Sequence, residues 1–267
     1  MSDDPHLPVV PSFRIGNSPA WLADPFVQCL VVIGAISVVF LTFPALDIWF
    51  SRQFYDEVTG TFPVAHLPAF IAIRELHSIM TWVIAVGLSL ALVYKILVPW
   101  QPSLVPPRDI LFILGTLAVG PGIIVNGLFK SFSGRPRPYQ TELFGGEMPF
   151  VGVWDITDHC ARNCSFISGE GSSAIWLITA TVLFPRRWRR TAFVILLGLG
   201  IVFALNRVAF GGHFLSDVLI AWFLTLGLIA LFERYLYASK GADERAAKAE
   251  EALTALGMAL RRPFTRA

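Results

Sequence analysis

Long apolar stretches separated by short polar linkers make up most of this 267-residue chain. A helix needs about 20 mostly apolar residues to cross a hydrocarbon core about 30 Å thick. Six stretches have this character. They are residues 26–46, 69–98, 109–129, 171–184, 191–209 and 214–236. The fourth is the shortest. Its polar Gly171, Ser172 and Ser173 are compatible with a helix whose outer turn lines a water-filled site enclosed by protein. The pattern predicts an all-α, polytopic membrane protein with six transmembrane helices.

The orientation follows from the basic linker 185–190, PRRWRR, between the fourth and fifth spans. Arginines in short loops stay in the cytoplasm, so both termini are expected inside. Three polar segments then fall on the outer side of the membrane: residues 47–68, 131–170 and 207–213. We expect the chemistry of the protein there, because these segments include most of the polar residues in the clusters described below.

Three regions follow from this layout. We expect a cytoplasmic N-terminal segment over 1–25, a six-span domain over 26–236 and a cytoplasmic tail over 237–267. Residues 1–14 lack the positive start and apolar core of a cleavable signal peptide, so the first span is expected to direct insertion. In the tail, residues 240–262 read as an amphipathic helix that lies in the cytoplasm or on the membrane surface.

Composition agrees with a membrane protein. Hydrophobic residues make up 55% of the chain and charged residues only 15%, which would leave a soluble domain with more apolar surface than it could bury. A net charge of +2 is too small to indicate a nucleic-acid partner. The bilayer itself, in a bacterial inner membrane, is the expected environment.

The first polar cluster, KSFSGRPRP, puts Lys130, Arg135 and Arg137 at the outer end of the third span. A guanidinium offers a planar fork of donors to phosphate oxygens, and an ammonium adds a point charge, so Arg137 with Lys130 can form a phosphate clamp. Basic residues at helix ends also reach toward lipid headgroups. Both interpretations are open for this cluster alone.

The second cluster places Ser168 and Gly169 immediately before the fourth span, followed by Glu170. A hydroxyl and free backbone N–H groups at a helix N-terminus can bind an anion. The same residues also make an ordinary helix cap, with Glu170 favoured by the helix dipole.

The third cluster, NRVAFGGHFLSD, contains Arg207, His213 and Asp217. Positions four apart on a helix lie on one face, so Asp217 can accept a hydrogen bond from one imidazole nitrogen of His213. The other nitrogen is then free to act as a nucleophile. Gly211 and Gly212 supply a break that can fold Arg207 back toward the histidine.

Together the clusters resemble the signature of the type 2 phosphatidic acid phosphatase (PAP2) superfamily: Lys-x6-Arg-Pro, Pro-Ser-Gly-His and Ser-Arg-x5-His-x3-Asp. Lys130 to Arg137-Pro138 matches the first part, and Asn206-Arg207 with His213 and Asp217 matches the third. The second part is altered, because Glu170 stands where the family has histidine. The resemblance extends over about 26–236.

The resemblance implies a metal-free hydrolysis without cofactors. His213 would attack phosphorus and form a phosphohistidine that water then hydrolyses, with Asp217 holding its tautomer. The phosphate oxygens would be bound by five groups. These are Lys130, Arg137, Arg207, the Ser168 hydroxyl and the Gly169 N–H.

The altered second part concerns the proton donor for the leaving oxygen. We expect Glu170 to replace the histidine as general acid, with His159 in the preceding loop as the rival donor. Loss of that histidine also fits a slow enzyme, or a leaving group that needs little protonation, such as an anomeric phosphate or a diphosphate.

Two further sets of residues lie on the outer side. Cys160 and Cys164 are expected to form a disulfide in an oxidising compartment, rather than a metal site with His159 that would have only three ligands. Arg74 and Glu75, near the outer end of the second span, either shape substrate recognition or form an interfacial ion pair that orients the helix.

The sequence therefore predicts a lipid phosphatase. Lipid A is the favoured substrate, because the altered second motif and the cysteine-bearing loop resemble those of bacterial lipid A phosphatases. Undecaprenyl diphosphate is the main alternative, followed by phosphatidylglycerophosphate. Two other classes stay open: a lipid phosphotransferase, and a non-catalytic transporter or lipid-binding protein with a vestigial site.

Overall fold

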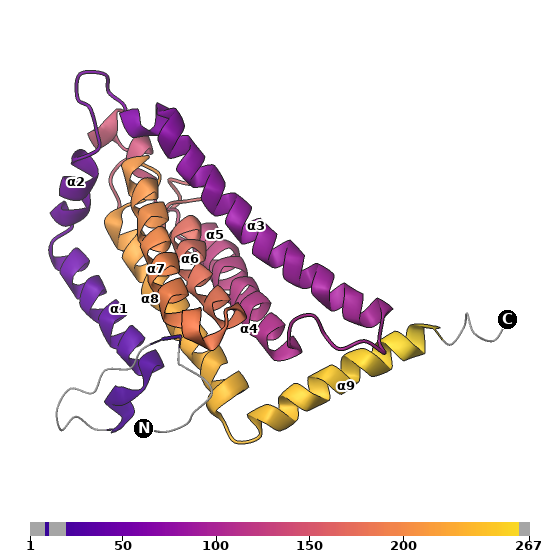
Figure 1. The fold of residues 1–267 in the computed structure, drawn as a ribbon. Helices are drawn as coiled ribbons and strands as arrows, with labels where there is room; N and C mark the ends of the chain where they lie inside the picture. The colour runs from indigo at the N-terminus through magenta and orange to yellow at the C-terminus, as the bar shows by residue number, and fades with distance from the viewer. Residues whose placement is uncertain (1–8, 11–19, 262–267) are drawn as a thin grey trace.

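The computed structural model describes residues 9–10 and 20–261 (Figure 1). Most of the sequence that we judged for a signal peptide therefore lies outside the described residues. Helices form all of the regular structure described, beside two isolated β-bridges, which confirms the all-α prediction. The α-helices are α1 (Pro25–Thr42), α2 (Ala45–Arg52), α3 (Pro68–Leu97), α4 (Pro107–Leu117), α5 (Lys130–Phe132), α6 (Gly169–Trp176), α7 (Arg186–Ala209), α8 (Leu215–Glu233) and α9 (Ala242–Arg261). Short 3₁₀ or π stretches are η1 (Ala20–Ala23), η2 (Pro63–His66), η3 (Ala118–Phe129), η4 (Pro138–Gln140), η5 (Glu142–Phe144), η6 (Leu177–Leu183) and η7 (Arg234–Ala238).

Among the described residues, five helical segments are long and apolar enough to cross a membrane. They are Pro25–Thr42, Pro68–Leu97, Pro107–Phe132, Arg186–Ala209 and Leu215–Ala238. The fourth predicted span is the shorter segment formed by α6 and η6. Its Trp176, Leu177 and Ile178 are almost fully buried, so neighbouring helices enclose it. This enclosure explains how a helix with several polar side chains can lie within the apolar region.

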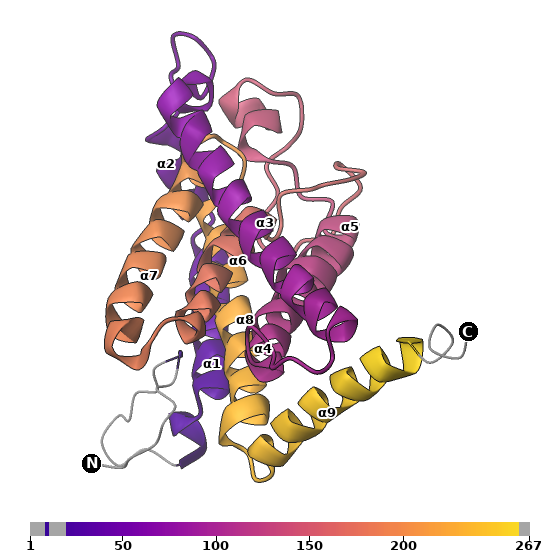
Figure 2. The same cartoon turned by 45° about the vertical axis from the view of Figure 1, so that its right-hand side comes forward.

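Helix α6 lies at the centre of the bundle, between α7, α8 and the α4–η3 segment (Figures 1 and 2). A Cβ on Gly200 of α7 would lie 2.9 Å from the carbonyl oxygen of Ala174, so α6 and α7 approach closely. The indole of Trp176 donates a hydrogen bond of 2.9 Å to the Ile113 carbonyl of α4. These contacts fix the C-terminal half of α6 relative to the surrounding helices.

The predicted tail helix is present as α9 and packs against the rest of the chain. It runs across one end of the bundle, below α3 and α4 in Figure 1. Lys95 forms an ion pair of 3.0 Å with Glu250, and a Cβ on Gly257 would lie 2.4 Å from the Ile96 carbonyl oxygen. Helix α9 therefore packs against the ends of α3 and α4 within the same chain.

Candidate active site

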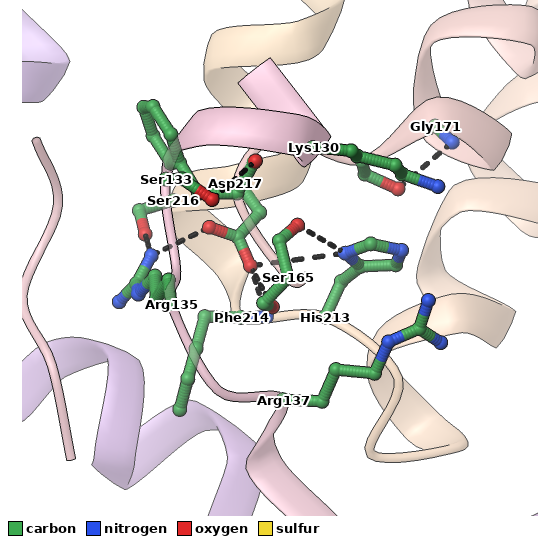
Figure 3. Close-up of polar contacts among 12 residues, drawn as sticks. Lys130, Ser133, Arg135, Arg137, Ser165, Gly171, His213, Phe214, Ser216 and Asp217 are labelled. Carbon is green, nitrogen blue, oxygen red and sulfur yellow. Dashed lines mark hydrogen bonds and ion pairs between the residues drawn. The ribbon is translucent and has the colours of Figure 1, made fainter. Parts of the chain in front are cut away.

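His213 lies in the short turn between α7 and α8. Its Nδ1 is 2.8 Å from the backbone carbonyl oxygen of Ser165 and 3.8 Å from Asp217 Oδ2 (Figure 3). A carbonyl oxygen only accepts hydrogen bonds, so Nδ1 carries the proton and Nε2 of the neutral ring holds a free lone pair. In Figure 3 this second nitrogen points away from Asp217. The carbonyl of Ser165, rather than the predicted Asp217 carboxylate, is the nearest group that sets the tautomer.

Burial also controls the charge of the His213 imidazole. His213 is 1% exposed, and this burial lowers its pKa to about 4, with Asp217 opposing the shift and Arg207 and Lys130 adding to it. The imidazole is consequently neutral at pH 7, the form that can attack phosphorus.

Asp217 belongs to a buried polar network at the base of the site. Its carboxylate lies 2.5 Å from Arg135 Nη1 and accepts hydrogen bonds from the Ser165 hydroxyl at 2.5 Å and the Phe214 backbone at 3.0 Å. The second terminal nitrogen of Arg135 donates to Asp47 at 2.9 Å. Solvent does not screen these buried ion pairs, so they hold Asp217 in one position. Because Asp217 also accepts a hydrogen bond from the Phe214 backbone, the network fixes the turn that carries His213.

Arg135, the third cation of the first cluster, belongs to this buried network. Its side chain is fully buried. It forms ion pairs with Asp47 and Asp217 and donates hydrogen bonds to the Ser216 hydroxyl and the Val151 carbonyl. Sequence reasoning missed Asp47, which comes from α2 and is 1% exposed. A carboxylate directly after an apolar span was the only signal for it, because its partners lie far away in sequence.

Lys130 and Arg137 do converge, and Asn163 joins them. The Asn163 side-chain oxygen lies 2.8 Å from Arg137 Nη2 and 3.4 Å from Lys130 Nζ. Nζ is also close to the start of α6, since a Cβ on Gly169 would lie 3.0 Å from it. In Figure 3 the ends of Lys130 and Arg137 lie on the side of His213 to which its free nitrogen points. Two cations and a helix N-terminus thus face this nitrogen.

Arg207 folds back toward His213 as the glycine pair predicts. Gly211 has a φ of +65°, and a Cβ on Gly212 would lie 2.6 Å from an Arg207 terminal nitrogen. Arg207 Nε lies 3.1 Å from Glu170 Oε2 as an ion pair without hydrogen-bond alignment. Arg74 binds the same carboxylate from α3 at 3.0 Å.

This geometry does not favour the predicted role of Glu170 as general acid. Two guanidinium groups stabilise its carboxylate form, which has no proton to donate. The rival donor, His159, is exposed in the loop beside the disulfide. The ion pair with Glu170 brings Arg74 into the site. Glu75 is exposed on α3 and lines a hollow that Arg74 and Glu170 also line.

Ser168 acts as a helix cap in the structure. Its side chain is buried and accepts a hydrogen bond of 3.0 Å from the Gly171 backbone, while its own N–H donates to the Asp217 carbonyl at 3.2 Å. Cys160 and Cys164 are joined by a disulfide in the preceding loop. The cap fixes the N-terminus of α6 beside the cations.

Comparisons with known proteins agree with the motif pattern. Residues 109–240 match the model of the PAP2 superfamily. Two relatives named lipid A 4'-phosphatase, from Rhizobium leguminosarum and Rhizobium etli, are 32% and 31% identical over 212 residues, covering 73% of this chain and 89% and 81% of theirs. A third of that name, from Francisella tularensis subsp. novicida, is 33% identical over 196 residues, which cover 71% of this chain and 85% of its own. No solved structure matches the chain significantly. The chain belongs to the PAP2 superfamily.

Proposed function

We propose that this protein is a multi-pass membrane phosphatase that removes the 4'-phosphate of lipid A. The relatives named for that activity cover nearly three quarters of the chain. The observation that carries the proposal is the convergence of Lys130, Arg137 and Arg207 around the turn that holds His213. A neutral imidazole with a free nitrogen beside three cations is suited to phosphoryl transfer.

In the proposed reaction, His213 Nε2 attacks phosphorus in line with the bond to the lipid oxygen. That bond breaks, the lipid oxygen takes up a proton from solvent water, and a phosphohistidine forms. Water then attacks phosphorus, which releases inorganic phosphate and returns the histidine. Asp217 stabilises the cationic ring of the intermediate across the 3.8 Å gap.

Lys130, Arg137 and Arg207 are assigned to the phosphate oxygens. Charge on these oxygens grows or is redistributed in the transition state, and cations already in place need no reorganisation. The Gly169 N–H, at the N-terminus of α6, adds a donor next to Lys130 Nζ. Ser168 supports this donor by capping the helix.

Glu170 is assigned a positioning role. Its carboxylate binds Arg207 and Arg74 at 3.1 and 3.0 Å, which keeps two guanidinium groups from repelling each other at the site. Substrate phosphate would find Arg207 already oriented.

A hydrophobic groove next to the phosphate site supports a lipid substrate. A groove of about 490 Å³ begins beside Lys130 and Glu170 and continues between apolar residues of α3 and of the α4–η3 segment, including Trp82 and Leu117. An acyl chain in this groove would stay in the apolar region while its headgroup meets the cations. With the basic linker in the cytoplasm, the site would face the periplasm of a bacterial inner membrane, with both termini inside.

The test is phosphate release by detergent-purified protein. Candidate lipids are lipid A, phosphatidic acid, phosphatidylglycerophosphate and undecaprenyl diphosphate. We expect release from lipid A without an added acceptor and unchanged rates with chelator. Release only with an acceptor lipid would indicate a phosphotransferase, and strong inhibition by chelator would contradict a metal-free reaction. Full cellular function of a His213→Ala variant would indicate a non-catalytic role.

A further inference from the structure

A second pocket lies beside the phosphate site. It has a volume of about 460 Å³ and is formed by the loop after α2, by the segment around η4 and η5, and by the turn before His213. Arg74, Arg137 and Arg207 all line it. The pocket therefore opens onto two of the cations assigned to phosphate.

The walls of this pocket are held together by aromatic packing. The rings of Tyr55, Phe62 and Phe144 pack with centroid distances of 5.2 to 5.5 Å, and Phe62 and Phe144 are buried. A Cβ on Gly211 would lie 2.5 Å from the Phe62 ring. The loop after α2 is thus fixed against the turn that carries the nucleophile.

The second wall is anchored to the same turn. The Tyr139 backbone N–H donates a hydrogen bond of 3.2 Å to the Gly211 carbonyl, and the half-exposed ring of Tyr139 lines the pocket. Gly145 adopts a φ of +79° and approaches Gly60 of the opposite loop, where a Cβ would lie 3.0 Å from its carbonyl oxygen. These contacts give the pocket rigid walls before any ligand binds.

The pocket's lining indicates the chemistry of its ligand. Aromatic side chains, including Tyr139 and Phe210, stand beside arginines and the polar Thr61 and His66. A pyranose ring has apolar C–H faces and polar hydroxyl edges, which match aromatic surfaces flanked by hydrogen-bond donors. A glycerol headgroup would leave most of such a volume empty.

We propose that this pocket binds the sugar that carries the phosphate, and so selects phosphorylated saccharide lipids over phosphoglycerolipids. The inference rests on the proposed function and specifies its substrate class. The sugar oxygen is the leaving group, so the ring must lie next to the phosphate, and the shared Arg137 and Arg207 place the pocket there. Arg74, Thr61 and His66 lie outside the matched 109–240 family region.

The test compares substrate binding with phosphate binding. Two variants change the pocket alone: Ala65→Trp fills it, and Tyr139→Ala removes an aromatic surface. Val58→Trp puts the same bulky ring at a position of the loop that is 94% exposed, and is the matched control. For each purified protein we would measure KM for a phosphorylated glucosamine glycolipid and the inhibition constant of inorganic phosphate.

We expect both pocket variants to raise KM for the glycolipid about tenfold while the inhibition constant of inorganic phosphate changes less than about twofold. Val58→Trp should change neither value. A parallel rise of both constants, or no change in KM, would overturn the sugar pocket while the phosphatase stands. If wild-type protein released no phosphate from the glycolipid, the proposed function would fail, before any variant was compared, and the sugar pocket with it.

Discussion

The Nδ1 atom of His213 lies 2.8 Å from the carbonyl oxygen of Ser165, nearer than any carboxylate oxygen of Asp217. The backbone just before α6 therefore orients the His213 ring, and the Ser165 hydroxyl binds Asp217 at the same time. One residue thus connects the second motif to the third.

The charge state of His213 gives the first prediction. Because burial lowers its pKa to about 4, the folded protein should hold it neutral from pH 7 down to about pH 5 and gain its proton only near pH 4. The nucleophile is lost as pH falls through that value. A histidine NMR titration, with the His213 resonance identified by its absence from a His213→Gln variant, measures this directly. A midpoint near the usual 6.5 would contradict the buried, neutral ring.

Arg135 gives a prediction about stability. Replacing it with Met leaves Asp47 and Asp217 buried without their cation, which should lower the free energy of unfolding by about 3–5 kcal/mol. Denaturation in detergent checks this. Arg137→Met is the matched control and should reduce activity while leaving stability nearly unchanged. A stable Arg135→Met protein with a raised KM would instead mean that Arg135 binds phosphate.

Glu170 can be tested as a positioning residue. Glu170→Gln keeps the shape of the side chain and removes its charge, so we expect kcat to fall by less than about tenfold with an unchanged alkaline limb of the pH profile. A general acid would lose about 10²–10⁴-fold in kcat, together with that limb. His159→Ala is measured in parallel, because loss of turnover in that variant alone would make His159 the proton donor.

Gly169 has a steric role that a single methyl group can test. A Cβ there would lie 2.5 Å from Asn126 Oδ1 and 3.0 Å from Lys130 Nζ. Gly169→Ala should displace Lys130 from the phosphate and reduce kcat/KM about a hundredfold. Gly198→Ala, where a Cβ meets nothing within 4 Å, is the control for helical glycine replacement. Equal activity of the two variants would argue against a phosphate site at this helix end.

The sequence predicted the helices and the motif residues for physical reasons that are local. Apolar length predicts a span, and a glycine pair predicts the turn that returns Arg207. It could not predict Asp47 opposite Arg135, or Asn163 between Lys130 and Arg137, because such pairs depend on how distant helices pack. The buried role of Arg135 could not be predicted for the same reason. Three neighbouring cations look equivalent in sequence, and only burial separates the structural one from the other two.

The most direct test of the central claim is to trap the covalent intermediate. Purified protein would be mixed with lipid A carrying a radioactive 4'-phosphate, quenched rapidly with alkali and examined for label on the chain. We predict a label that survives alkali and is lost in acid, as a phosphohistidine should be, and no label on a His213→Gln variant. Phosphate release by wild-type protein with no such label, or an equal label on the variant, would contradict His213 as the nucleophile.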